Sequence, residues 1–326
     1  MAVYRVTLGV RSALATPLAS DTLWGHVAWG YAYRHGDGAV RTWIEAHSGS
    51  EPPLVLSDPL PHGILPRPHV PGLPRPSEPP SEADADRHEA MRRVEWIAEE
   101  HWPVYGRQIT SATFEETLAG CSAATGAKAS DMHAAINRLT GGTAQDGGGT
   151  LYSVDRTYYD AGAKVDVWAA TSESAATLRD WLVDGLAGGY GRDGASGSGW
   201  IEVESVTSSQ LPGADARTAN ACMLLGYAVP APSDPVHGFF DWTVRAGRIG
   251  GTFSQASTPS GSTKRQKRAV IMLSRGSVLV GEPRATVGRL LGGVHDDPAI
   301  KAHLRTLAIP LRLSEELVLE AKEEGQ

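Results

Sequence analysis

The order in which strand and helix patterns follow one another constrains this chain more than any other feature. Residues 2–10 alternate apolar and polar side chains, as strands do, and residues 20–35 repeat apolar side chains at helical spacing. The same patterns return later, with strands expected at 151–159 and 163–169, a helix capped by Thr171 or Ser172, and a strand at 200–206. Strand, helix, strand, strand, helix, strand is the order of a ferredoxin-like unit.

Apolar spacing also predicts which helical side chains are buried. In the first helix, with Ser20 or Asp21 as its N-cap, the buried stripe is expected to comprise Trp24, Val27, Ala28 and Tyr31. In the second helix it is expected to comprise Leu178, Trp181, Leu182 and Leu186. The strands 151–159 and 163–169 are expected to pair with each other around the turn "YDAGA".

A long insertion, at about residues 50–150, interrupts this first unit. Its first part, 51–80, is rich in proline, which removes backbone donors and excludes regular helix or a central strand. That part still carries leucines and valines to bury, so we expect an ordered loop over a core. Residues 82–102 predict a polar amphipathic helix, and the glycines of 141–149 predict a mobile loop.

The remainder of the chain predicts a second, less regular domain. Its helix signals are weaker, and strands are expected at 219–229, 239–245, 268–273, 277–281 and 305–313. The sequence therefore predicts an α+β fold of tandem ferredoxin-like domains. The first would span 1–210, with the insertion and a glycine-rich loop at 188–199, and the second 211–326.

Composition limits the classes of function. With 326 residues and a formal net charge of −7, the chain is not a nucleic-acid binder that works through an overall positive field. Its two cysteines, Cys121 and Cys222, form neither a disulfide framework nor a zinc-binding spacing. The N-terminus alternates rather than resembling a signal peptide, and no stretch approaches the ~20 apolar residues that span a bilayer. We expect a cytoplasmic protein without a membrane partner.

The segment "GGYGRDGASGSGW" at 188–200 contains a match to the dinucleotide fingerprint G-x-G-x-x-G. That fingerprint must follow a strand and open a helix, and here the order is reversed. A flexible hairpin tip is one interpretation. The other is backbone that approaches a polyanion, with N–H groups directed into one concavity and hydroxyls donating to phosphate. The candidate residues are Gly188, Gly189, Tyr190, Gly191, Arg192, Gly194, Ser196 and Ser198.

A second group of candidates is basic. The stretch "KRQKR" at 264–268 and the segment "VRAGRIGG" could supply phosphate contacts, although a solvated basic loop is an equally good interpretation of any one residue. The candidates are Arg245, Arg248, Lys264, Arg265, Lys267 and Arg268. No histidine and carboxylate spacing points to a metal site, and we expect no cofactor.

Several stretches carry a family resemblance when taken together and in order. They are "SDTLWGHVAWGYA" (20–32), "PPLVLSDPLPHGILPRP" (52–68), "AINRLTGGTAQDGGGTLYSVDRTYY" (135–159), the glycine-rich loop, "FFDWTVRAGRIGGTF" (239–253) and "KRAVIMLSRGSVLVG" (267–281). With them the chain resembles the RAMP superfamily of CRISPR proteins, and more closely the Cas-five group, subunit four of type III-A Csm effectors. It departs from that family in the second half of the glycine-rich loop, where Ala195 and Ser196 replace a frequent basic residue.

The resemblance implies a role without catalysis at one end of an RNA-guided antiviral ribonucleoprotein. Such a subunit grips the 5′ tag, or handle, of the crRNA and binds the large polymerase-like (Cas-ten) subunit and the first Cas-seven-like backbone subunit. A thumb-like hairpin in the insertion displaces a nucleotide of the guide–target duplex, so target RNA near the guide 5′ end is a further partner. By position, Asn137 and Arg138 are candidate RNA contacts.

Three alternatives remain. The same superfamily contains endoribonucleases that process CRISPR repeat RNA, often with a histidine as general acid or base, and His26, His62 and His69 are available here. The chain could be the equivalent subunit of a type III-B effector. It could also be a structural adaptor that never touches RNA, which would suit its negative charge.

Overall fold

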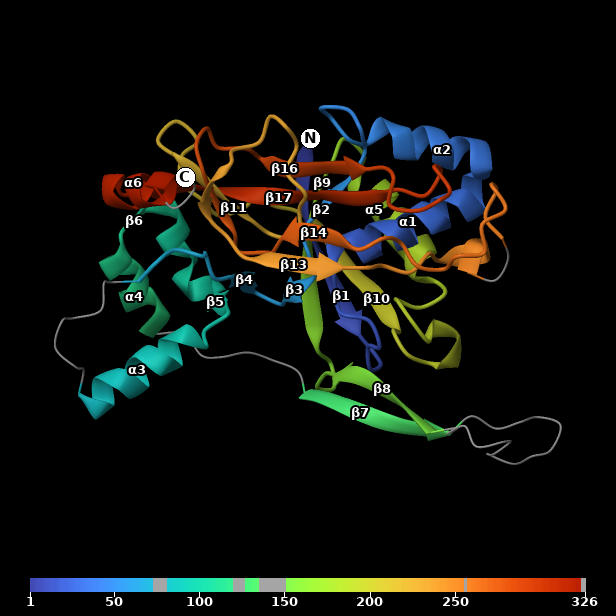
Figure 1. The fold of residues 1–326 in the computed structure, drawn as a ribbon, viewed down its shortest axis with the longest axis horizontal. Helices are drawn as coiled ribbons and strands as arrows, with labels where there is room; N and C mark the ends of the chain where they lie inside the picture. The colour runs from blue at the N-terminus through green and yellow to red at the C-terminus, as the bar shows by residue number, and fades with distance from the viewer. Residues whose placement is uncertain (73–80, 120–126, 135–150, 255–256, 324–326) are drawn as a thin grey trace.

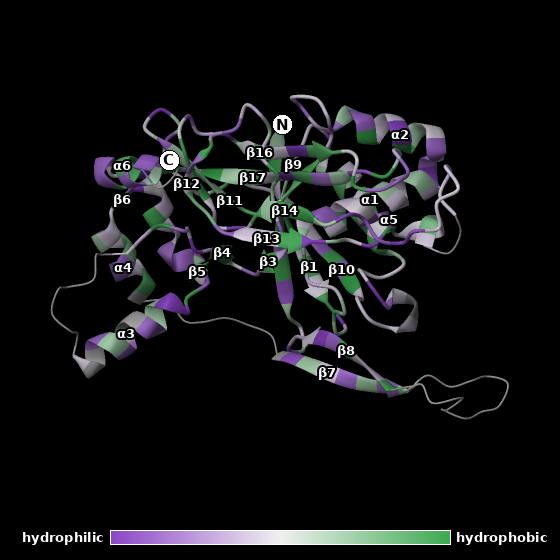
Figure 2. Ribbon diagram, viewed as in Figure 1, coloured by the Kyte–Doolittle hydropathy of each residue, from purple (hydrophilic) through white to green (hydrophobic). Residues whose placement is uncertain are grey.

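The chain forms a mixed α+β structure in which two antiparallel sheets share the centre of the molecule (Figure 1). The computed structural model describes residues 1–72, 81–119, 127–134, 151–254 and 257–323. Asn137, Arg138 and the loop 141–149 lie outside these residues. Figure 2 shows that hydrophobic residues gather in the strands at the middle of the molecule. The expected α+β class is confirmed, whereas the domain boundary near residue 210 stays a prediction.

The first sheet has the strand order β10-β1-β9-β2, with β3 also paired to β9. Its long strands are β1 (Ala2–Val10), β9 (Lys164–Thr171) and β10 (Ile201–Ser208), all antiparallel. The two short ones, β2 (Val55–Leu56) and β3 (Leu60–Pro61), come from the proline-rich segment. The expected strands 2–10, 163–169 and 200–206 are thus found within two residues of the predicted bounds.

The expected pairing of 151–159 with 163–169 is wrong. β8 (Leu151–Tyr158) pairs with β7 (Ala127–Ala134) instead, and the two form a hairpin that extends from the lower edge of the body as drawn in Figure 1. β9 cannot accept β8, because β1 occupies one of its edges and β2 and β3 occupy the other. The sequence therefore did not predict the strands on the second edge of β9, because they lie in the proline-rich segment, where prolines argue against strands.

Two helices cover one face of the first sheet and confirm most of the predicted stripes. α1 (Ser20–His35) buries Trp24, Val27 and Ala28, whereas Tyr31 is only partly buried. α5 (Ala175–Leu186) buries all four predicted residues. Its N-cap is Ser174 rather than Thr171 or Ser172, since β9 continues through Thr171. The short helix α2 (Asp37–Ala46) packs beside α1 through Trp43.

As far as it is described, the insertion packs as a layer against the opposite face of the first sheet. Its buried side chains are Leu54, Val55, Leu56, Leu60 and Leu65, as expected of a loop over a core. The predicted helix at 82–102 is shorter: α3 (Glu82–Arg92) is followed by β5 (Trp96–Ala98), which pairs with β4 (Ile64–Pro66). The 3-10 helix η1 (Glu99–Gly106), β6 (Gln108–Ile109) and α4 (Ser111–Ala119) complete the layer.

The second sheet has the order β12-β15-β11-β17-β16, and β6 joins β17 in parallel. All five predicted strand regions contain strands: β11 (Ala221–Leu224), β12 (His237–Phe239) with β13 (Trp242–Arg245), β14 (Val270–Leu273), β15 (Val278–Val280) and β17 (Ala302–Leu313). The strand β16 (Thr286–Leu291) was missed. Between 221 and 313 the described residues form no α-helix, only the 3-10 turn η3 (Gly251–Ser254), and α6 (Glu315–Glu323) follows β17.

One apolar core joins the insertion to the second sheet. It packs Leu65 and Phe114 of the insertion with Met223, Ile309 and other buried residues of the second sheet. Among the described residues no helix is long and apolar enough to cross a membrane.

Candidate nucleic-acid interface

The glycine-rich segment connects α5 to β10 through backbone that only glycine adopts readily. Positive φ angles occur at Gly189, Gly191, Gly197 and Gly199, and Asp193 also has φ of 64°. A Cβ on Gly199 would lie 2.1 Å from the carbonyl oxygen of Tyr190. The composition of the segment therefore follows from a tightly folded path and from close backbone contacts.

This path is held against the loop that leads into α1. The N–H groups of Gly191 and Arg192 donate to His26 Nε2 at 2.9 Å and to Thr16 Oγ1 at 2.8 Å. Farther along, the N–H of Gly199 donates to Ala13 O at 2.9 Å. These donors are satisfied within the protein, so they cannot also bind phosphate. The expectation that successive N–H groups face one open concavity is wrong for this stretch.

Tyr190 and the two serines also differ from the expected surface residues. Tyr190 is fully buried, its hydroxyl accepts from the N–H of Ala19 at 2.9 Å, and it donates to Pro17 O at 3.0 Å. Burial raises the pKa of this phenol. Ser198 is buried, and the Ser196 hydroxyl donates to Asp193 O at 3.0 Å. Tyr190 therefore anchors the segment, and Arg192 is the charged side chain that it exposes.

A hollow of about 850 Å³ lies between this segment, α5 and β10. Gly188, Gly189, Gly194 and Gly197 form part of its wall, and a Cβ on Gly188 or Gly197 would meet no atom within 4 Å. Trp200 lines the hollow with 58% of its surface exposed. Its lining is partly apolar, and an exposed aromatic side chain such as Trp200 can stack on an unpaired base. Sequence analysis missed Trp200, although it ends the quoted segment.

Two of the predicted basic residues lie near the N-terminus of α1. Arg245 of β13 pairs with Asp21 at 2.7 Å and lies over the ring of Tyr227. Lys267 donates to the carbonyl oxygen of Lys301 at 2.8 Å, and burial lowers its pKa. Together with Asp21 they line a narrow crevice. Since Ala19 contacts Tyr190, the beginning of α1 links this crevice to the glycine-rich segment.

The other basic candidates are exposed. Lys264 and Arg268 both pair with Asp296, at 2.7 and 3.1 Å. Arg265 lies exposed on the same segment, and Arg248 is exposed without an ion pair to any described residue. Arg268 also lines the crevice with Arg245 and Lys267, and Arg248 is bridged to Gln266, so these basic candidates lie on neighbouring segments that differ in exposure.

The β7–β8 hairpin presents side chains that the sequence analysis did not single out. Met132 and Leu151 are exposed near its far end, and the rings of His133 and Tyr152 stack at 5.5 Å. Residues 127–134 show no regular alternation of apolar and polar side chains, so the sequence carries no clear signal for β7. On the same hairpin, Tyr158 donates its hydroxyl to Asp131 at 2.6 Å.

The motif Ser57-Asp58 of the proline-rich segment connects α1 to the second sheet. Asp58 is fully buried, and its Oδ1 accepts the N–H of Ser20 at 2.8 Å. The predicted N-caps of α1 are wrong: the N-cap is Ala19, which has no capping side chain, and Asp58 supplies the acceptor. Arg275 Nη1 lies 3.5 Å from the other carboxylate oxygen. Burial raises the pKa of Asp58.

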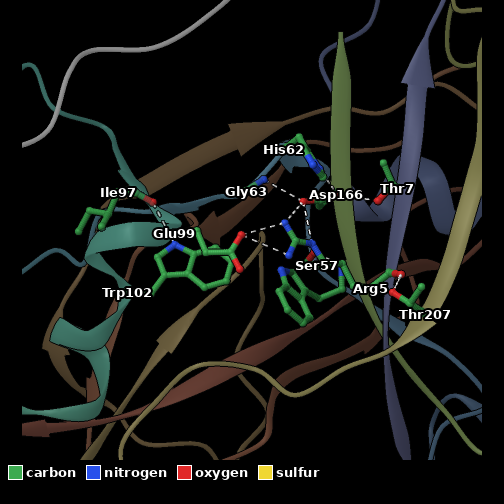
Figure 3. Close-up of polar contacts among 11 residues, drawn as sticks. Arg5, Thr7, Ser57, His62, Gly63, Ile97, Glu99, Trp102, Asp166 and Thr207 are labelled. Carbon is green, nitrogen blue, oxygen red and sulfur yellow. Dashed lines mark hydrogen bonds and ion pairs between the residues drawn. The ribbon is translucent and has the colours of Figure 1, made fainter. Parts of the chain in front are cut away.

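A second buried carboxylate, Asp166 of β9, attaches the same segment to the first sheet (Figure 3). It accepts from Arg5 Nη2 at 2.6 Å, from the N–H of Gly63 at 2.9 Å and from Thr7 Oγ1 at 3.0 Å, and it lies 2.9 Å from His62 Nδ1. Burial by itself raises the pKa of Asp166, but the hydrogen bonds from Arg5, Gly63 and His62 outweigh it, so the pKa lies below its usual value.

Comparison with known proteins gives a result for structure only. No family model and no curated protein sequence matches the chain. Among solved structures, the Csm3–Csm4 subcomplex of the type III-A CRISPR–Cas interference complex matches with a TM-score of 0.56 at 13% identity, over 96% of this chain and 100% of that chain. The Csm1–Csm4 cassette with pppApA matches with a TM-score of 0.56 at 13% identity, over 97% and 100%.

The chain has the Csm4 fold. The cassette bound to cA4 also matches, with a TM-score of 0.56 at 13% identity, over 96% of this chain and 99% of that chain. The resemblance that the sequence motifs indicated is therefore confirmed at the level of fold and along nearly the whole chain.

Proposed function

We propose that this protein is the Csm4-like subunit of a type III-A CRISPR effector, acting without catalysis in the cytoplasm. It would bind the 5′ tag of the crRNA and join the large subunit to the first backbone subunit in antiviral defence. In this proposal both halves of the chain are ferredoxin-like in origin. The first half keeps the complete order of elements, β1-α1-β2-β9-α5-β10. The second half keeps a sheet without the helices that would lie between its strands.

The observation that carries the proposal is the full-length likeness to Csm4 chains in complexes with two different subunits. Those chains occur with Csm1 in one set of structures and with Csm3 in another. An identity of 13% preserves the fold without fixing the function. The second support must therefore come from the surface of this chain.

That surface offers what a single-stranded RNA end requires. The exposed Arg192 and Trp200 beside the hollow belong to one segment, which therefore offers a cation for phosphate and a ring for base stacking. The net charge of −7 does not oppose this, because the binding of one short tag needs local rather than global positive charge. The same segment is anchored by Tyr190 and is therefore held in shape before RNA binds.

The β7–β8 hairpin fits the role of the thumb. It extends from the body and exposes Met132, Leu151 and Tyr152 near its far end (Figure 1). Large apolar side chains on a narrow support can enter a base step and displace a nucleotide. Target RNA near the guide 5′ end would contact this end.

The endoribonuclease alternative receives less support from the histidines. His26 accepts the N–H of Gly191, and burial lowers its pKa. His62 is bound to the buried Asp166, and His69 has Asp241 3.8 Å away. His26 and His62 each have a hydrogen-bond partner within the protein, and His26 lies against the buried Tyr190 ring at 5.3 Å rather than in an open site.

The test is to purify the chain from its native host through an affinity tag and to sequence the RNA that accompanies it. The proposal predicts RNA species that share one 5′ end derived from a CRISPR repeat. The purified chain incubated with repeat RNA should leave it uncut. Cleavage of that RNA, or an assembly that contains no RNA, would contradict the proposal.

A further inference from the structure

The two-stranded ribbon β13–β14 exposes three large apolar side chains on one face. Trp242 and Val244 lie two positions apart on β13, and Ile271 of β14 is directly opposite Val244. Their exposed fractions are 61%, 62% and 63%. Neighbouring Thr243 and Arg245 point the other way and are partly buried. The outward face of the ribbon is therefore apolar where a monomer would normally be polar.

The backbone of the same two residues also lacks strand partners. The N–H of Ser274 donates to Asp241 O, so residues 241, 243 and 245 exchange hydrogen bonds with β14. Antiparallel alternation then directs the N–H and C=O groups of Trp242 and Val244 away from β14. Within the described parts of the chain, β13 pairs with β14 alone. The opposite edge of the ribbon is already used, because Leu273 exchanges both bonds with Ala228.

The chemistry of this edge fits a polypeptide rather than a phosphate ligand. Arg245 is already paired with Asp21, and the exposed carboxylate of Asp241 begins the strand, so the edge offers no phosphate site. No lysine or proline interrupts positions 241–244, although natural proteins use these residues to protect a free edge. Unpaired N–H and C=O groups beside apolar side chains match the backbone and side chains of an extended polypeptide.

We propose that the outer edge of β13 binds an extended, apolar segment of another protein subunit, which adds as a strand beside Trp242 and Val244. The proposal rests on the proposed function only in that the segment belongs to a subunit of the same effector. Main-chain hydrogen bonds would supply affinity, and Trp242, Val244 and Ile271 would pack against alternate side chains of that segment.

The experiment compares amide hydrogen exchange of β13 in the isolated chain and in the assembly that a tagged copy forms in its native host. The amides of Trp242 and Val244 should exchange at least tenfold more slowly in the assembly. The protection should survive ribonuclease treatment, because a polypeptide rather than RNA covers the edge.

Two variants of Val244 distinguish the contribution of the backbone edge to partner binding from the contribution of the side chain. Val244→Pro removes only the outward donor and leaves the bonds with β14 in place, whereas Val244→Lys charges the apolar face. Each should lower the amount of partner protein retained at least tenfold without changing the thermal midpoint of the isolated chain. The control, Val236→Lys, alters a residue 71% exposed that lies outside the ribbon and should change retention less than twofold.

Three results would overturn the inference: equal exchange in the two states, protection that ribonuclease removes, or protection in the isolated chain that rises with its concentration. The last would identify a second copy as the occupant. Absence of guide RNA from the wild-type assembly would instead contradict the proposed function, because protection by protein is measured independently of RNA.

Discussion

At the scale of single residues, Arg5 contacts two carboxylates that differ in burial. Asp166 has 2% of its side chain exposed and Glu99 has 56%, and the guanidinium lies over the rings of Trp102 and Trp168. We expect Asp166→Asn to lower the free energy of unfolding by ~2–4 kcal/mol, because Arg5 would lose its buried partner. Glu99→Gln should cost under ~1 kcal/mol. Urea unfolding of both variants measures this, and equal losses would contradict the assignment.

Arg192 is the residue on which the predicted phosphate contact depends. Among the described residues its guanidinium pairs with Asp193, 3.3 Å away, and its side chain is 43% exposed. Arg192→Ala should weaken retention of guide RNA by ~1–3 kcal/mol, with a shallower salt dependence because one phosphate contact is lost. Arg41→Ala, which removes an exposed charge from α2, is the matched control. Filter binding over a salt series would show the same slope for both variants if Arg192 lies outside the site.

At the scale of elements, two glycines of one segment should respond differently to alanine. At Gly191 φ is +74° and a Cβ would lie 2.4 Å from Thr16 Cβ, whereas at Gly188 it would meet nothing within 4 Å. Gly191→Ala should lower the free energy of unfolding by ~1–3 kcal/mol and weaken RNA retention, because the segment must move away from Thr16. Gly188→Ala should leave stability unchanged. Thermal unfolding of the pair tests the path of the backbone.

The spacing of apolar residues predicted those helices and strands that bury one face and expose the other. Alternation in Ala2–Val10 and the stripes of α1 and α5 identified elements whose one face meets the core. The sequence did not predict β2 and β3, because strands of two residues beside prolines are too short to show an alternation of apolar and polar side chains. The sequence pattern also assigned β8 to the wrong partner, since pairing depends on which edges of β9 are already occupied.

The candidate site shows the same limit. Sequence reasoning found the glycine-rich segment and Arg192, because composition marks an unusual backbone. It could not foresee that His26 and Thr16 satisfy the N–H groups of that segment, since these contacts join residues more than 160 positions apart. The acceptor that Asp58 supplies to the N-terminus of α1 was also missed, because it comes from a segment 38 positions away from Ser20.

At the scale of the whole molecule, α1, α2 and β17 meet around two buried histidines. His47 follows α2 and His303 lies on β17, with ring centroids 5.0 Å apart, and Trp24 stacks on His303. Neither Nε2 has a hydrogen-bond partner among the described residues. Burial is the main cause that lowers the pKa of His47 to about 4 and that of His303 well below 6.5, and the nearby Arg305 guanidinium contributes to both decreases.

This junction should make folding sensitive to mild acid. The unfolded chain binds protons at these histidines near pH 6.5, whereas folded His47 resists protonation until about pH 4, so the free energy of unfolding must fall as the pH drops through that window. His47 alone would account for a decrease of about 3 kcal/mol.

The variant His303→Phe tests this account, because it keeps a ring against Trp24 and removes one proton-binding group. Urea midpoints between pH 7.5 and 4.5 should therefore change less in this variant than in the wild type, while His35→Phe, at the exposed end of α1, should behave as wild type. An unchanged pH profile for His303→Phe would mean that His303 is already protonated in the folded protein, or that the junction opens before the rest of the molecule unfolds, and either result contradicts the two-histidine account.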